Sequence, residues 1–122
     1  MNITWPDIND VPIINIECDD KRVFSIVILD YDAPTSPYLH MWYQNVCIEH
    51  TTDVIVSYAP PSPPHKAEHH YEVRVYKQNL PKLKVTSEIK RAGFNPTAYG
   101  LLSKNIIASK TFLSNGTYLK PQ

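Results

Sequence analysis

The chain has 122 residues, which suits one compact domain and leaves no room for a second core of ordinary size. Hydrophobic residues make up 43% and charged residues 20%, a composition that excludes an intrinsically disordered chain. Twelve basic side chains balance twelve acidic ones, so no net charge draws the protein to nucleic acid or to an anionic membrane surface. We therefore expect a monomer with a single domain over residues 1–122, without a nucleic-acid partner, in which a local site holds any ligand.

Strand-forming runs follow one another along most of the chain. Val, Ile, Tyr, Phe and Trp are concentrated in them, and we expect strands at residues 11–17, 22–30, 40–49, 53–58 and 70–78. Residues 85–103 have helical potential, which Gly93, Pro96 and Gly100 break into at most two short helices. Residues 106–112 then predict a last strand, and Asn115-Gly116 a terminal turn. The predicted fold class is mostly β.

Two of these runs indicate how the strands are layered. Residues 23–29 are apolar on both faces apart from Ser25, which is typical of a strand covered on both sides. Residues 70–75 alternate polar and apolar side chains, as a strand with one face in the core does. Prolines outnumber glycines eleven to three and cluster at residues 34–37 and 60–64, where they predict rigid loops.

The apolar stretches are too short to cross a bilayer, and the N-terminus lacks a basic-then-apolar signal pattern. We therefore expect a cytoplasmic protein with no membrane span. Cys18 and Cys47 are the only cysteines, and two thiols in that compartment are usually reduced core residues. Cys47 would also share a strand face with Met41 and Tyr43. We expect buried thiols rather than a bridge between them.

The polar residues with chemical potential stand where predicted strands meet the proline loops. Asp30 and Asp32 follow the buried strand, although aspartates also favour strand ends merely because they bond nearby backbone N–H groups. His40 opens the next strand, and His69 and Tyr71 begin a later one at spacing i and i+2. One end of the sheet is thus predicted to collect two histidines, two aspartates and a tyrosine hydroxyl.

Such a group suits a phosphate-type anion. Imidazoles and a phenol donate hydrogen bonds to phosphate oxygens, while carboxylates orient the imidazoles. Since a bare carboxylate repels an anion, one aspartate must either be neutralised by its histidine partner or face a cationic part of the ligand, such as an ethanolamine ammonium. This favours a zwitterionic head group. His65, His69 and His70, with His50 as a distant fourth, fit no strong zinc pattern, so we expect neither a metal nor a cofactor.

Three segments then resemble one known family, the phosphatidylethanolamine-binding proteins, which include the Raf kinase inhibitor proteins and the plant flowering regulators. Residues 30–34 resemble the family signature Asp-Pro-Asp-Ala-Pro, and residues 39–46 its Leu-His-Trp-x-x-x-Asn-Ile segment. Residues 58–71 are similar to its Tyr-x-x-Pro-x-Pro loop and Gly-x-His-Arg-Tyr strand. The matches run in family order between residues 22 and 112, and three motifs in register are a specific signal.

The resemblance implies a large antiparallel sheet packed on a smaller sheet, with one or two short helices and a small anion pocket at one end. It implies a non-enzymatic module for phosphate-type ligands or phospholipid head groups that modulates a protein partner such as a kinase or protease. No catalytic residues are expected. The pocket residues that it implies are Asp30, Asp32, His40, His69 and Tyr71, with walls from Ala33, Pro34, Tyr38 and Pro63.

Four positions depart from the family pattern, and two alternatives stay open. Tyr31, Met41, Ala67 and His70 replace proline, tryptophan, glycine and arginine, so a permanent charge that braces this region is lost at His70. If Tyr31 or His70 filled the pocket, the chain would be a degenerate scaffold for protein interaction alone. The other alternative is a hydrolase in which a histidine and an aspartate act on a small ester or phosphodiester.

Overall fold

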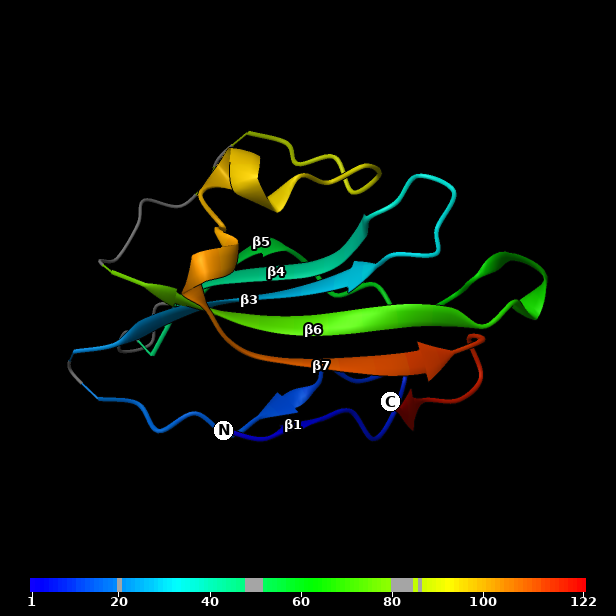
Figure 1. The fold of residues 1–122 in the computed structure, drawn as a ribbon, viewed down its shortest axis with the longest axis horizontal. Helices are drawn as coiled ribbons and strands as arrows, with labels where there is room; N and C mark the ends of the chain where they lie inside the picture. Colours follow the sequence, from blue (N-terminus) through cyan, green and yellow to red (C-terminus); the bar gives the residue numbers. More distant parts are fainter. Residues whose placement is uncertain (20, 48–51, 80–84, 86) are drawn as a thin grey trace.

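The computed structural model describes residues 1–19, 21–47, 52–79, 85 and 87–122. Its main element is a six-stranded antiparallel sheet in the order β5-β4-β3-β6-β7-β8, and β1 and β2 form a separate two-stranded sheet (Figure 1). The strands are β1 (Ile3–Thr4), β2 (Ile13–Ile14), β3 (Val23–Asp30), β4 (Tyr38–Val46), β5 (Asp53–Val56), β6 (His69–Gln78), β7 (Ile106–Ser114) and β8 (Lys120–Pro121). The predicted mostly β architecture, a large antiparallel sheet packed on a smaller one, is confirmed.

The helical content is confined to short 3-10 turns. These are η1 (Pro64–Lys66), η2 (Pro96–Tyr99) and η3 (Ser103–Asn105). Two of them fall within or at the edge of the region where at most two short helices are predicted, whereas η1 is not predicted. Among the described residues, no helix is long and apolar enough to span a membrane.

β3 separates two apolar layers, as its two apolar faces predict. On one face Phe24, Ile26 and Ile28 pack with residues 1–18, which we call the N-terminal arm. Ile3 and Trp5 of this arm are 6% and 4% exposed. On the other face Val27 and Leu29 pack under the segment that carries η2 and η3. Because alternate side chains of β3 are buried on opposite sides of the sheet, β3 lies at the centre of the domain. Close packing on both faces keeps the strand, and the polar residues at its end, in a fixed position.

The predicted strands are real, but their ends shift. The run 11–17 contracts to the two residues of β2, and the run 40–49 becomes β4, which ends at Val46. Residues 48–49 of that prediction lie outside the described residues. β6 shows the predicted alternation, with Tyr71, Val73 and Val75 buried in the core.

The prediction of reduced, buried thiols is wrong. Cys18 and Cys47 form a disulfide with a Cα–Cα distance of 5.2 Å. Cys18 is exposed and Cys47 is half-buried, so neither is an enclosed core residue. Cys47 lies just beyond β4 with a positive φ of 81°, and it therefore leaves the face alternation on which the core assignment rested. The bridge ties the end of the N-terminal arm to the end of β4.

Candidate functional site

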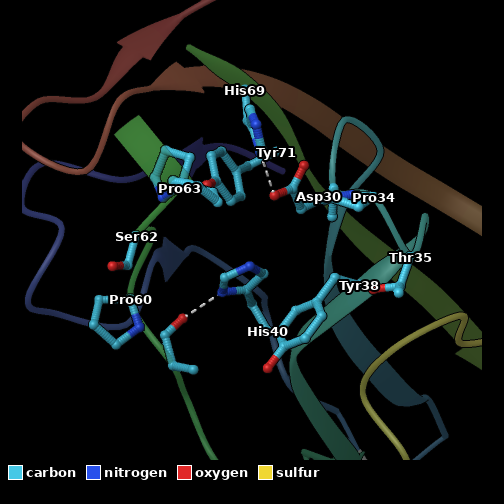
Figure 2. Close-up of a pocket in the computed structure, with 13 residues that line it drawn as sticks. Asp30, Pro34, Thr35, Tyr38, His40, Pro60, Ser62, Pro63, His69 and Tyr71 are labelled. Atoms are coloured by element: carbon cyan, nitrogen blue, oxygen red, sulfur yellow. Dashed lines mark hydrogen bonds and ion pairs between the residues drawn. The ribbon is translucent and has the colours of Figure 1, made fainter. Parts of the chain in front are cut away.

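The strand register gathers the candidate site at the end of the large sheet where β3 runs out. Asp30, the last residue of β3, pairs with Tyr38 of β4 on one side and with Tyr71 of β6 on the other. His40 follows Tyr38 by two residues and His69 precedes Tyr71 by two, so the strand alternation turns each to the same face as its neighbour. Figure 2 shows these side chains around a common hollow.

That hollow is a cavity of about 380 Å³. The two proline loops wall it, and proline rings hold a loop rigidly because φ is restricted. Tyr38, His40 and Tyr71 supply its aromatic sides. The complete lining is Asp30, Ala33, Pro34, Thr35, Tyr38, His40, Ala59, Pro60, Ser62, Pro63, Pro64, His69 and Tyr71.

Asp30 and His69 form a buried pair. The distance from His69 Nδ1 to Asp30 Oδ2 is 2.8 Å, and the two side chains are 10% and 5% exposed. The other carboxylate oxygen, Asp30 Oδ1, accepts a hydrogen bond of 2.9 Å from the backbone N–H of Asp32. Asp30 is therefore fixed from two sides, and it fixes the imidazole so that Nε2 is the ring nitrogen left to meet a ligand.

His40 is oriented by the backbone of the second proline loop. Its Nδ1 lies 2.7 Å from the carbonyl oxygen of Ala59, and the N–H of Ala59 donates back to the His40 carbonyl at 2.8 Å. Because a carbonyl only accepts, Nδ1 carries the proton. Burial lowers the pKa of His40, and the Arg91 charge acts in the same direction, against the raising influences of Ala59 and Asp30. The neutral form is thus the stable one.

Tyr71 stands between the two imidazoles as a neutral hydroxyl donor. Burial raises the pKa of Tyr71, and the neighbouring Asp30 carboxylate raises it further. Its ring meets that of His40 edge-on at a centroid distance of 5.2 Å and that of Trp5 at 6.3 Å. The N-terminal arm therefore packs beside the pocket, against the same face of the sheet.

Asp32 is placed outside the lining. Its Oδ2 accepts from the backbone N–H of His70 at 2.6 Å and lies 2.6 Å from His70 Nδ1. These hydrogen bonds lower the pKa of Asp32. Asp32 therefore orients His70, not His40 or His69, and the exposed Asp32–His70 pair braces the first loop where the family motif has arginine.

The residues that depart from the family pattern do not plug the cavity. Tyr31 is 40% exposed, and its hydroxyl contacts Glu72 at 3.1 Å and Arg74 on the outer face of the sheet. Met41 is buried in the core, and Ala67 follows η1. The residues predicted as pocket walls, namely Ala33, Pro34, Tyr38 and Pro63, line the cavity.

Sequence reasoning missed part of the site. Thr35, Ala59, Pro60, Ser62 and Pro64 also line the cavity, and the proline clusters were a signal that could have found most of them.

No pattern in the sequence pointed to Arg91 as part of the site. Its guanidinium donates to the carbonyls of Leu39 at 3.2 Å, His40 at 3.1 Å and Ser57 at 2.8 Å. These bonds clamp the start of β4 to the segment that enters the second proline loop. Arg91 therefore holds the site together without lining it.

Metal binding gains no support from the geometry. Across the described ranges, no group of three or more His, Cys, Asp or Glu side chains is arranged to hold an ion. His50, one of the four histidines considered, lies outside those ranges.

Comparison with known proteins points to one family. The model of the phosphatidylethanolamine-binding protein family matches residues 2–112. Comparison with curated proteins gives no match. Because the family match covers most of the chain, and because the strands and loops that it spans build the pocket just described, the chain belongs to the phosphatidylethanolamine-binding protein family.

Proposed function

We propose that the pocket binds a phosphate-type anion, such as the head group of phosphatidylethanolamine, and that the protein is a binding module rather than an enzyme. The observation that carries the proposal is the convergence of His40, His69 and Tyr71 on one cavity of about 380 Å³. That volume lies at the small end of ligand sites, which span roughly 300–1,000 Å³. It suits a head group, and we expect no extraction of the lipid tails.

The donors are arranged for an oxyanion. The Tyr71 hydroxyl and a protonated His69 Nε2 can each donate to a phosphoryl oxygen. Asp30 lies 2.8 Å from His69 and orients its ring. Because the imidazolium offsets the negative charge of Asp30, the carboxylate does not repel the ligand as a bare carboxylate would. The proline walls keep these groups preorganised, so little ordering is needed when the ligand binds.

The proposal includes a protein partner, such as a kinase or a protease, that is modulated through this site. The family is one of binding and regulatory proteins, which supports the general role. The disulfide favours an oxidising compartment over the cytoplasmic location expected from the sequence, because disulfides persist mainly in such compartments.

Titration of labelled protein with phosphorylethanolamine, followed through the imidazole NMR signals, tests the binding. We expect the signals of His40 and His69 to shift together and saturate. His70 and His65 lie outside the lining and are internal controls. Unmoved His40 and His69 signals at millimolar ligand would refute the proposal.

The Asp30–His69 pair also favours a second candidate, a hydrolase. A carboxylate that orients an imidazole is the usual arrangement for a general base. Ser62 is the serine of the lining, but no hydrogen bond joins it to His40 or His69 within the described part of the chain. Turnover of an ester or phosphodiester panel that is lost in His69→Ala would favour this candidate, whereas binding without turnover favours the first.

A further inference from the structure

The charged groups of the pocket make an unusual set for an anion site. Of the thirteen lining residues, none is lysine or arginine. The permanent charge among them is the carboxylate of Asp30, which is 4% exposed. Arg91, whose charge acts on His40, donates to three backbone carbonyls and does not line the cavity. Positive charge can enter this lining only as a proton on an imidazole.

The protonation states of the lining side chains set limits on the net charge of the empty pocket. A protonated His69 is compensated by Asp30 at 2.8 Å, so the pair is neutral, and a neutral His69 leaves it at minus one. His40 adds no charge in its buried neutral form, and burial together with the Asp30 carboxylate keeps Tyr71 a neutral phenol. Asp32 and His70 offset each other outside the lining when His70 is protonated. The pocket therefore carries a charge between minus one and zero.

A ligand adds its own charge to this total. A singly charged ligand meets one imidazolium and one phenol as donors, and the filled pocket holds a single excess negative charge. A doubly charged ligand leaves two excess charges unless His40 is also protonated, which its burial opposes. Because charges in a partly dry cavity repel strongly, the second charge is costly.

We infer that the pocket selects tetrahedral anions with at most one net negative charge, that is phosphodiesters such as a lipid head group or monoprotonated phosphate monoesters, over dianions such as free phosphomonoesters that lack a cationic group. Phosphorylethanolamine belongs to the first class, because its ammonium offsets one charge of its phosphate. This inference rests on the proposed function and adds the charge state of the ligand to it. A phosphodiester keeps one charge at every physiological pH, whereas a free monoester gains its second charge near neutrality.

Two probes with fixed charges separate these classes. Dimethyl phosphate is a monoanion and sulfate a dianion throughout pH 5.5–8, so their affinities report the protein's protonation and not their own. At pH 8 we expect dimethyl phosphate to bind roughly tenfold or more tightly than sulfate. At lower pH the preference shrinks, because a bound dianion can draw an additional proton onto an imidazole more easily. Calorimetry or the imidazole shifts give both constants.

A matched pair of variants locates the source of the selectivity. Asp30→Asn removes the carboxylate from the lining, so the preference for dimethyl phosphate over sulfate at pH 8 falls by a factor of several. Glu72→Gln removes the same charge from the opposite face of β6, where Glu72 bonds Arg74, and it leaves the preference unchanged. If Asp30→Asn does not fold, the pH dependence of the wild-type preference carries the test alone.

The possible outcomes separate charge selectivity from anion binding as such. Sulfate binding as tightly as dimethyl phosphate at pH 8 overturns the charge selectivity while the proposed anion site stands. Binding of neither probe, nor of phosphorylethanolamine, refutes the proposed function itself and the selectivity with it.

Discussion

Opening the Cys18–Cys47 bridge perturbs the domain without touching the pocket. The bridge joins two residues 29 positions apart and closes a loop that contains all of β3 and β4. The chain-entropy relation for a loop of this length gives a stabilisation of about 3.5 kcal/mol at 25 °C. Cys18 is exposed and Cys47 half-buried, so replacing the sulfur atoms by hydroxyls removes little packing. We expect Cys18→Ser/Cys47→Ser to lose about 2–4 kcal/mol of its free energy of unfolding.

Urea unfolding measures this loss, with the fluorescence of the buried Trp5 and Trp42 as the signal. The oxidised wild type is compared with the double variant, and the wild type with reductant is the control because it should match the variant. A difference below about 1 kcal/mol would refute the reasoning, since the closed loop would then not constrain the unfolded chain.

Three further predictions concern the supports of the pocket. Trp5→Ala removes a 4% exposed indole that meets Tyr71 and Phe112 edge-on. We expect the free energy of unfolding in urea to fall by about 3–5 kcal/mol. A decrease under about 1 kcal/mol would show that the arm does not support the sheet. Arg91→Met removes the hydrogen bonds to three carbonyls. We expect the free energy of unfolding to fall by about 1–3 kcal/mol and phosphorylethanolamine to bind more weakly. Unchanged binding would mean that these hydrogen bonds do not shape the site. Burial lowers the pKa of His40, so below pH 6.5 the unfolded chain binds a proton that the folded chain refuses, and stability falls as the pH drops from that value. His40→Gln should flatten this part of the stability profile, and an identical profile would exclude His40 as its source.

The strand content and the order of the site residues were readable from the sequence. A strand puts alternate side chains on opposite faces, so the patterns in β3 and β6 report burial directly from the chain. The two proline clusters marked the loops at one end of the sheet. Asp30, His40, His69 and Tyr71 stand where strands meet these loops, and the structure places all four in one lining.

Interactions between distant segments could be decided only by the tertiary structure. The path of the N-terminal arm brings Cys18 within bridging distance of Cys47, and nothing in the local sequence around either cysteine encodes that path. Arg91 meets backbone carbonyls, which every residue carries, so its partners left no mark on the sequence.

Asp30 and Asp32 show the division most clearly. Both stand where the same predicted strand runs out, and from the sequence both were expected to orient the pocket histidines. The structure ends β3 at Asp30, so Asp30 keeps the strand geometry and faces His69 in the pocket, whereas Asp32 lies in the turn beyond and bonds His70 outside the lining. Local patterning therefore determined which residues reach this end of the sheet, and the point at which the strand stops decided which of them share the cavity, because side-chain direction follows the backbone only while the strand continues.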